Sequence, residues 1–403
     1  MPVTNIVTLG CRLNIAESEA IRTMVGDRAV TVVNSCAVTN EAVANTTRAI
    51  RRLRRLHPDA ELVVTGCAAN IEPDRYRAMP EVDRVVPNIG KLDPAHWGAV
   101  DTPPSPAKRA TFTNFARAFV EVQNGCDHRC TFCAIPFGRG PSRSLPAGGV
   151  IEQIRQFVDA GHREIVLTGV DLTSYGHDLP GQPTLGQLVG RILLHVPALP
   201  RLRLSSLDGI EIDDRLFALL TQEARVMPHV HLSLQAGDDM ILKRMKRRHS
   251  RAQSVALVER LKAARPAIAI GADLIAGFPT EDDAAFANTL ALLDDCDVVH
   301  PHIFSFSPRT GTPAARMPQV APALVKQRAT RLREAAQSRR AAWLRSLIGT
   351  RQSILVERPG DRGHAENFAE VKSASNPIAA RTGQIAPVQI TDATENALTG
   401  TFA

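Results

Sequence analysis

The sequence has few aromatic residues and lacks any long hydrophobic run. Phe, Trp and Tyr together make up 4% of the 403 residues, so stacking of bases on many exposed rings is not the expected mode of binding. No stretch of about 18 uncharged apolar residues occurs, which argues against a transmembrane helix. The first residues lack the basic and long apolar segments of a signal peptide. These absences predict a cytoplasmic protein that does not enter a membrane.

The charge of the chain is only mildly unbalanced. Lys and Arg number 48 against 41 Asp and Glu, which gives a net charge of +7. That surplus suits an anionic partner such as RNA but does not establish one. A hydrophobic content of 44% is ordinary for a globular chain, and the length allows two or three domains. The seven cysteines of so large a chain indicate metal ligands, catalytic groups or core residues before disulfides.

Hydrophobic patterning divides the chain into three structured parts and a linker. Residues 1–98 alternate short β-rich runs with helical stretches, as an α/β domain does. Residues 99–117 contain three closely spaced prolines and are expected to be a linker. Residues 118–345 hold six strand–helix units, including a helical stretch over Asp239–Ala264, and predict a partial (β/α) barrel; a doubly wound open sheet would give the same pattern. Residues 346–403 predict a small all-β module.

The segment Cys126-Asp-His-Arg-Cys130-Thr-Phe-Cys133 is the most informative in the sequence. Three thiolates on one tight loop, just after the first expected barrel strand, can converge on one metal centre. Structural zinc normally takes four ligands, usually from two separated cysteine pairs. A triplet on one loop suits an iron–sulfur cluster that keeps one iron open for another ligand. The alternative is a zinc loop that borrows His128 or Cys296 as its fourth ligand.

Three further cysteines, Cys11, Cys36 and Cys67, each follow an expected strand almost directly. Ligands of parallel α/β sheets gather at the carboxyl ends of the strands, so these cysteines would share one edge of the N-terminal sheet. The alternative for each one alone is a buried core thiol, since free cysteine is among the most buried residue types. Their common position favours a second metal centre. Cys296 has no such placement and is expected in the core.

These motifs resemble those of a known family. Cys126 to Cys133 resembles the cysteine signature of radical S-adenosylmethionine (SAM) enzymes. With Cys11, Cys36 and Cys67 ahead of it and a small β module behind, the whole chain resembles the methylthiotransferases. The resemblance implies an N-terminal α/β methylthiotransferase domain, a central partial (β/α) radical SAM barrel over 118–345 and a C-terminal TRAM domain of OB-like shape over 346–403 that binds RNA.

Three branches of that family differ in substrate. Two modify adenosine 37 of tRNA, carrying either an isopentenyl or a threonylcarbamoyl group, and the third modifies an aspartate of a ribosomal protein. The segments Thr8–Asn14, Asn34–Asn40 and Gly125–Gly140 resemble the threonylcarbamoyl branch. The resemblance therefore implies transfer of a methylthio group to C2 of N6-threonylcarbamoyladenosine, with the other two substrates as alternatives.

The C2–H bond of adenine is unactivated, and no side-chain acid or base can exchange that hydrogen for sulfur, so the protein has to hold a radical-forming cofactor. By resemblance, Cys126, Cys130 and Cys133 hold a [4Fe-4S] cluster that binds SAM and reduces it to a 5′-deoxyadenosyl radical. A second [4Fe-4S] cluster, on Cys11, Cys36 and Cys67, would carry the sulfur that is methylated by another SAM. The two clusters should face each other across a dry cavity.

Polar and glycine residues at the ends of the barrel strands are candidates for binding SAM. Each has the alternative role of capping a helix or a turn, and Gln235 is the best of them because its surrounding block resembles the family. The candidates are Thr168, Gly169, Asp171, Ser205, Ser206, Ser233, Gln235, Asp273, Gly277 and Ser305.

Positive charge is concentrated in three places, which become candidates for tracking RNA phosphates. The usual alternative for a charge run is a solvated face. The clusters are Arg48, Arg51, Arg52 and Arg55; Lys243, Arg244, Lys246, Arg247 and Arg248; and Arg328, Arg331, Arg339 and Arg340. The partners implied by the resemblance are a tRNA, through its anticodon-loop adenosine 37, and an electron donor such as a flavodoxin or ferredoxin. A monomer is expected. A non-catalytic zinc RNA-binding protein is the alternative of a different class.

Overall fold

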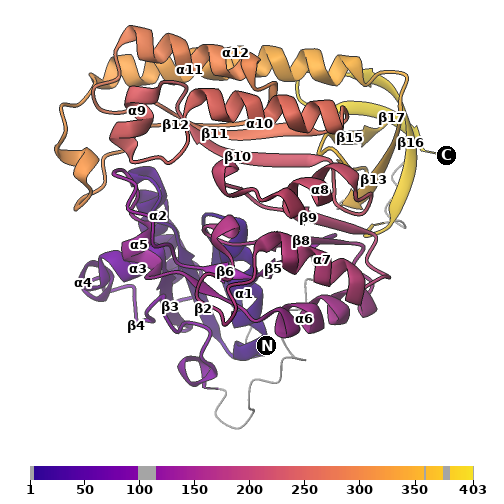
Figure 1. Ribbon diagram of the computed structural model, residues 1–403. Coiled ribbons are helices and arrows are strands. Elements are labelled where there is room, and N and C mark those ends of the chain that lie inside the picture. The colour runs from indigo at the N-terminus through magenta and orange to yellow at the C-terminus, as the bar shows by residue number, and fades with distance from the viewer. Residues whose placement is uncertain (1–3, 99–114, 358–359, 375–381, 403) are drawn as a thin grey trace.

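The computed structural model describes residues 4–98, 115–357, 360–374 and 382–402. Most of the expected linker, 99–117, lies outside the described residues. Three bodies follow one another along the chain: an N-terminal α/β unit, a central strand–helix unit, and a C-terminal β-barrel at the opposite side of the molecule from the N-terminal unit (Figure 1).

The N-terminal unit is a parallel four-stranded sheet in which each strand pairs with the next one along the chain. The strands are β1 (Asn5–Thr8), β2 (Val30–Ser35), β3 (Glu61–Gly66) and β4 (Arg84–Val85). The helices are α1 (Arg12–Val25), α2 (Asn40–Leu56), α3 (Cys67–Ile71) and α4 (Pro73–Arg77). All six residues of β2 are buried, as expected for a central parallel strand covered on both faces.

The central unit has two three-stranded parallel sheets, in the orders β5-β8-β9 and β10-β11-β12. Their strands are β5 (Ala118–Glu121), β8 (Glu164–Thr168), β9 (Arg201–Leu204), β10 (His229–Gln235), β11 (Ala269–Ala276) and β12 (Val298–Ser305). A single parallel bridge, Leu207 to Leu232, links the two sheets just beyond β9. Because every strand neighbours its successor and the order never reverses, the partial barrel is confirmed and the doubly wound alternative is excluded.

The remaining elements of the central unit are the helices around the strands and two short strands near the first cysteine loop. The helices are α5 (Ile135–Arg139), α6 (Ala147–Asp159), α7 (Leu185–His195), α8 (Asp214–Gln222), α9 (Asp239–Met245), α10 (Arg251–Ala264), α11 (Asp283–Asp295) and α12 (Pro322–Ser346). The short strands are β6 (Gln123–Asn124) and β7 (Arg143–Ser144). Single 3-10 turns cover Leu172–Ser174, Gly209–Glu211 and Pro313–Arg316, and another, Pro94–Trp97, lies in the N-terminal unit.

The helical stretch expected over Asp239–Ala264 is interrupted. Helix α9 ends at Met245, and the next residue, Lys246, adopts the left-handed conformation with φ +58°. Helix α10 then begins with a capping box, in which Ser250 and Gln253 satisfy each other's backbone N–H groups. The apolar periodicity continues across this break, so it gives no sign of the interruption.

The C-terminal module is a closed five-stranded barrel, in the order β13-β14-β15-β17-β16. Its strands are β13 (Arg351–Glu357), β14 (Arg362–Ala365), β15 (Glu370–Ser373), β16 (Ile385–Ala393) and β17 (Leu398–Phe402). The β-rich runs Gln352–Glu357, Ala369–Lys372 and Val388–Thr391 predict β13, β15 and part of β16, whereas no such run predicts β14 or β17. Both missed strands contain a glycine against a neighbouring backbone: a Cβ on Gly363 would lie 2.1 Å from the Leu355 carbonyl oxygen.

A buried ionic group joins this small barrel to the amino ends of the central strands. Glu164, the first residue of β8, accepts hydrogen bonds from Arg117 at 2.9 Å and Arg203 at 3.1 Å. Arg203 also donates to the carbonyl oxygens of Ala365 and Glu366 in the C-terminal barrel. The small barrel is therefore packed against the end of the strands opposite to their carboxyl ends.

In the part of the chain that the structure describes, no helix combines the length and the apolar character needed to cross a membrane.

Candidate active site at the carboxyl ends of the strands

The first cysteine triplet lies on the loop between β6 and α5, and a glycine begins it. Gly125 has φ +73°, and a Cβ there would lie 1.9 Å from the Pro141 carbonyl oxygen, so a side chain would displace the loop. The backbone N–H of the next residue, Cys126, donates to the Gly140 carbonyl at 3.1 Å. The two ends of the loop are thus joined at its first cysteine, through the hydrogen bond between Cys126 and Gly140.

Gln123 positions this loop against the end of β8, a role that the sequence pattern does not indicate. Its Nε2 donates to the Gly125 carbonyl at 2.7 Å, and its Oε1 accepts from the backbone N–H groups of Val170 at 3.0 Å and Asp171 at 2.9 Å. The Gln123 side chain is buried. One amide therefore connects the cysteine loop with the segment that carries two of the expected SAM-binding residues, Gly169 and Asp171.

The second triplet lies at the carboxyl ends of three adjacent strands. Cys11 is the N-cap of α1, Cys36 follows β2, and Cys67 follows β3. The parallel registers of β1, β2 and β3 bring these positions to one edge of the sheet. A Cβ on Gly10, which has φ +103°, would lie 3.0 Å from Cys36 Sγ. Cys36 and Cys67 are buried, and Cys11 is exposed.

The two triplets come from different bodies, and their supporting segments are in contact. Gly138 of α5 packs on Cys67, with its would-be Cβ 3.1 Å from Cys67 Cβ. Asn88 Nδ2 donates to the Gly138 carbonyl at 2.6 Å and lies 3.8 Å from Cys67 Sγ. A second amide, on Asn70, donates to the Phe137 carbonyl at 3.0 Å. The edge of the N-terminal sheet therefore adjoins the first cysteine loop.

A buried ionic group fixes this junction. Glu17 of α1 contacts Lys91 Nζ at 2.5 Å and Arg139 Nη1 at 2.8 Å, and all three side chains are at most 2% exposed. Burial alone would raise the pKa of Glu17, but the charges of Lys91 and Arg139 lower it to about 2. Because Arg139 ends α5 in the central unit, Glu17 ties the N-terminal unit to the segment that follows the cysteine loop.

The spacing of the sulfur atoms tests whether the cysteines suit a single zinc ion or a larger cluster. Zinc–sulfur bonds of about 2.3 Å require sulfur atoms roughly 3.8 Å apart. Among the described residues, no three cysteine sulfurs lie within 4.8 Å of one another. Cys296 is buried in the barrel core, and His128 Nε2 contacts Asp171 at 2.8 Å, so neither completes a zinc set in this structure. The two triplets offer only sulfur donors, the ligand type that iron–sulfur clusters take.

Burial makes the thiolate form of these cysteines costly. It raises the pKa of Cys126 to about 12 and that of Cys133 to about 11. Burial also raises the pKa of Cys36 and Cys67. Cationic iron supplies the compensating charge when it binds, since metal coordination deprotonates a thiol.

The expected SAM-binding residues fall into two groups in space. Asp171 lies beside the loop, with Oδ2 3.8 Å from Cys126 Sγ and 2.8 Å from Ser174 Oγ. Gly169 lies against Gln123. Thr168, Ser205, Ser206, Ser233 and Gln235 lie at the carboxyl ends of β8, β9 and β10 or just beyond them.

The other three candidates have contacts of their own. Asp273 is in the middle of β11, where its Oδ1 accepts from His231 Nε2 at 3.0 Å and His302 Nδ1 at 3.2 Å. Gly277 packs against Val325 of α12. Ser305 is an exposed residue at the end of β12.

One residue of the second cationic cluster lies in the site instead of on the surface. Arg247 Nη1 is 3.7 Å from Cys130 Sγ, and its Nη2 donates to Asp208 Oδ2 at 2.9 Å and to the Ser233 carbonyl at 3.0 Å. Its side chain is only 9% exposed. The adjacent Arg248 contacts Asp208 as well. In the sequence Arg247 belongs to a run of basic residues, so the pattern does not indicate its contact with Cys130.

The other expected RNA contacts differ in exposure. Lys243, Arg244 and Lys246 are exposed, as are Arg48, Arg51, Arg52 and Arg55 along α2. The third cluster does not form a free cationic face: Arg328 is buried and donates to Glu281 and Asp283, and Arg339 and Arg340 bond to residues of the barrel and its loops.

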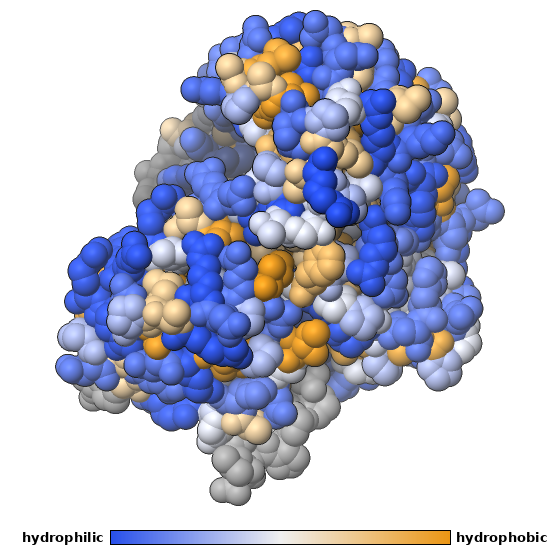
Figure 2. All heavy atoms as spheres, turned by 90° about the vertical axis from the view of Figure 1, so that its left-hand side faces the viewer, coloured by the Kyte–Doolittle hydropathy of each residue, from blue (hydrophilic) through white to orange (hydrophobic). Residues whose placement is uncertain are grey.

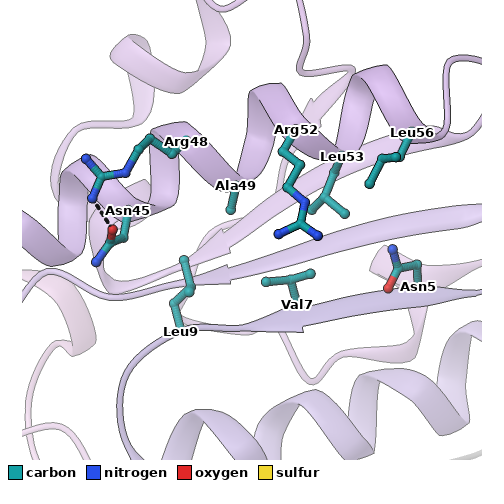
Figure 3. A pocket seen from close by; sticks show the side chains of 9 residues that line it. All are labelled: Asn5, Val7, Leu9, Asn45, Arg48, Ala49, Arg52, Leu53 and Leu56. Carbon is teal, nitrogen blue, oxygen red and sulfur yellow. Dashed lines mark hydrogen bonds between the residues drawn. The ribbon is translucent and has the colours of Figure 1, made fainter.

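The exposed arginines of α2 flank a groove along the free edge of β1. The groove has a volume of about 540 Å³ and lies between β1 and α2, with Arg48 and Arg52 on its helix side and Asn5 and Val7 on its strand side (Figure 3). Figure 2 shows a largely hydrophilic surface on the side of the molecule that carries α2 and α9, with a few apolar patches between them.

Comparisons with known proteins agree with this division of the chain. Residues 120–293 match the radical SAM superfamily, and residues 4–87 match the family described as uncharacterized protein family UPF0004. Each match contains one cysteine triplet. The threonylcarbamoyladenosine tRNA methylthiotransferase MtaB of Rickettsia prowazekii is 46% identical over 91% of this chain and 90% of its own length.

Other relatives have lower sequence identity to this chain. The tRNA-2-methylthio-N(6)-dimethylallyladenosine synthase of Sorangium cellulosum is 34% identical over 90% of this chain and 84% of its own. Among solved structures, the radical SAM methyltransferase TsrM from Kitasatospora setae, with cobalamin and a [4Fe-4S] cluster bound, has a TM-score of 0.52 at 14% identity, over 82% of this chain and 68% of its own. That likeness shows the fold alone. By sequence, the chain belongs to the family of the MtaB threonylcarbamoyladenosine tRNA methylthiotransferases, within the radical SAM superfamily.

Proposed function

We propose that this protein is a tRNA methylthiotransferase that adds a methylthio group to C2 of N6-threonylcarbamoyladenosine at position 37. The observation that carries the proposal is the meeting of two cysteine triplets from two bodies, joined where Gly138 packs on Cys67. The identity of 46% with a threonylcarbamoyladenosine enzyme, against 34% with a dimethylallyladenosine synthase, supports the choice of substrate.

The cofactors are two [4Fe-4S] clusters and SAM. Cys126, Cys130 and Cys133 would hold one cluster, and Cys11, Cys36 and Cys67 the other. Thr168, Gly169, Asp171, Ser206, Ser233 and Gln235 would contact SAM at the carboxyl ends of the strands, and we keep Asp273, Gly277 and Ser305 as weaker candidates. When bound, these groups supply the one-electron chemistry that breaks the C2–H bond and the sulfur that replaces the hydrogen.

The residues of the chain orient these groups and exclude water. Arg247 donates toward Cys130 Sγ and stabilises its thiolate charge. Asp171 accepts from His128, and that hydrogen bond raises the pKa of His128, so a proton is held at Nε2 close to Cys126. Gln123 fixes the spacing between the loop and β8. The ion pairs of Glu17 with Lys91 and Arg139 hold the two triplets in fixed positions relative to each other across the junction between the units.

We further propose the division 1–98, 118–345 and 346–403 into methylthiotransferase, radical SAM and TRAM domains, with 99–117 as linker. The exposed residues Arg48, Arg51, Arg52, Arg55, Lys243, Arg244 and Lys246 would contact tRNA phosphates. The reductant would be a flavodoxin or ferredoxin, and the protein a cytoplasmic monomer. The exposed charges of α2 and α9 support an anionic partner on that side of the molecule.

Nucleoside mass spectrometry tests the function directly. The protein is expressed in a bacterium that makes threonylcarbamoyladenosine but not its methylthio form, and total tRNA is digested. Appearance of the 2-methylthio nucleoside is the expected result. Its absence, with brown iron-loaded protein in hand, would refute the substrate and direct the search to isopentenyladenosine and to ribosomal protein. A colourless, zinc-loaded protein would refute the enzyme class as well.

Substitutions separate the roles of the two triplets. Cys126→Ala should abolish cleavage of SAM, whereas Cys11→Ala should retain part of the cleavage and lose methylthio transfer. Cys296→Ala is the matched control, since that thiol is buried in the barrel core, and should keep the iron content of the wild type. Equal loss of both activities in the first two variants would contradict separate roles.

A further inference from the structure

A group of arginines lies where the amino ends of the central strands meet the C-terminal barrel, and one of them differs from the rest. Arg117, Arg201 and Arg203 each contact Glu164, at 2.9, 3.7 and 3.1 Å. Arg12 comes from the N-terminal unit, at the start of α1, and its guanidinium reaches the same junction beside Phe368. Among the described residues, its guanidinium has no carboxylate within 4.0 Å and no hydrogen bond, and its charged group contacts the Phe368 ring at 5.4 Å.

The acidic residues near Arg12 already have other partners. Glu164 is shared by three arginines, and Asp273 Oδ1 accepts from both His231 and His302. The Phe368 ring also lies 4.8 Å from the Arg203 guanidinium, so its attraction is divided between cations. A part-buried guanidinium that lacks an anion loses hydration without a compensating ion pair. Arg12 is therefore available to an anion brought by a ligand.

The position of Arg12 in the chain indicates which ligand that is. It follows Cys11 directly, so its side chain starts beside one of the proposed cluster ligands, and its guanidinium extends from there to the Phe368 ring. On adenine, C2 and C6 are separated by a single ring atom, and the threonylcarbamoyl group is attached through N6. A base whose C2 faces the cysteines therefore holds that group close by. The group carries one ionised carboxylate, and a planar guanidinium binds a carboxylate through two parallel hydrogen bonds.

We propose that Arg12 binds the threonyl carboxylate of the substrate and so selects threonylcarbamoyladenosine over adenosines with uncharged N6 substituents. This inference rests on the proposed function. The inference requires a negative charge on the substrate. The preference for the carboxylate over a neutral substituent therefore has to disappear when the Arg12 guanidinium is removed.

The test compares two RNA stem-loops of the anticodon arm, one with threonylcarbamoyladenosine and one with the threonyl carboxylate converted to the neutral amide. The proteins are the wild type, Arg12→Gln, Arg12→Lys and the control Arg22→Gln, a more exposed arginine of the same helix. The wild type and the control should prefer the carboxylate by about 100-fold in kcat/KM, as expected for loss of one partner of a desolvated charge pair. Arg12→Gln should show nearly equal values for the two substrates, and Arg12→Lys should retain part of the preference.

Iron content, the visible spectrum and SAM cleavage without RNA serve to show that each variant keeps its clusters. A purely structural or phosphate-binding role of Arg12 would lower kcat/KM for both substrates equally, and that result would overturn the inference. If Arg12→Gln fails to hold its clusters, the comparison rests on the wild type alone. Equal kcat/KM of the wild type for the carboxylate and the amide stem-loops would then overturn the inference. If the wild type acts on neither stem-loop but on isopentenyladenosine, the proposed function itself fails, which is a separate outcome.

Discussion

Replacing Glu17 by Gln should destabilise the N-terminal unit more than any other single exchange of a carboxylate for an amide in that unit. The change keeps the volume of the side chain but leaves Lys91 and Arg139 as neighbouring buried cations. Removing one partner of a buried ion pair costs about 3–5 kcal/mol, because the remaining charge stays desolvated. We expect a loss in that range, together with a weakened junction between the two cysteine triplets.

Urea unfolding followed by tryptophan fluorescence measures this loss. The chain has two tryptophans, and Trp97 is buried with its Nε1 donating to the Lys91 carbonyl at 2.6 Å. In a Trp343→Phe background, Trp97 is then a local reporter of the Glu17 group. The matched control is Glu19→Gln on the same helix, whose partner Arg22 is 38% exposed; its cost should stay below about 1 kcal/mol.

The pH dependence gives a second readout with a defined sign. The pKa of Glu17 is about 2 in the folded protein against an ordinary 4.5, so its contribution is present above pH 4.5 and is lost as the pH falls towards 2. The wild type should lose stability more steeply than Glu17→Gln between pH 5 and pH 3. Equal slopes, or a Glu17→Gln protein within about 1 kcal/mol of the wild type, would refute the reasoning. Adding Lys91→Met to Glu17→Gln should recover part of the loss, because it removes one unpaired charge.

Three further changes have defined outcomes. Gly125→Ala should disrupt the first cysteine loop through its clash with Pro141 and reduce bound iron by about half, measured by iron analysis against Gly148→Ala, whose position is open. Glu164→Gln should loosen the C-terminal barrel by about 3 kcal/mol, seen as faster proteolysis between the two barrels; unchanged proteolysis would contradict the role given to this group. The double change Arg48→Ala and Arg52→Ala should weaken tRNA binding and lower its salt slope by about two, with iron content unchanged; an unaltered slope would remove α2 from the RNA interface.

The sequence predicts the strand-end position of the second triplet because parallel strands bring their carboxyl ends to one edge. Cys11, Cys36 and Cys67 each follow a strand, and pairing in chain order places them side by side. The side-chain partners of Asp273 are not predicted in this way. It lies within β11 and accepts from His231 and His302 of the two neighbouring strands, and such partners depend on the register between strands.

Contacts between distant parts of the chain could not be predicted at all. Lys91 and Arg139 lie 74 and 122 positions from Glu17, and nothing in their local sequence indicates a buried charge. Arg247 lies within a run of basic residues, so its composition suggests a solvated face. Its burial follows from the turn between α9 and α10, which begins at a lysine with positive φ that the apolar periodicity does not reveal.

The docking of the C-terminal barrel sets a length scale for the RNA. That barrel is held at the amino ends of the central strands by Arg203, whereas the cysteine loop lies beyond their carboxyl ends. Strand β11 has eight residues, which at about 3.3 Å per residue span roughly 23 Å. A tRNA that contacts the small barrel and whose base lies at the first cysteine loop has to bridge about that distance. The second triplet lies nearer, because Arg12, next to Cys11, contacts Phe368 of the small barrel. Because the buried ionic contact of Arg203 holds the small barrel in place, the distance to the first cysteine loop is constant, and an RNA fragment shorter than that distance contacts only one of these two places.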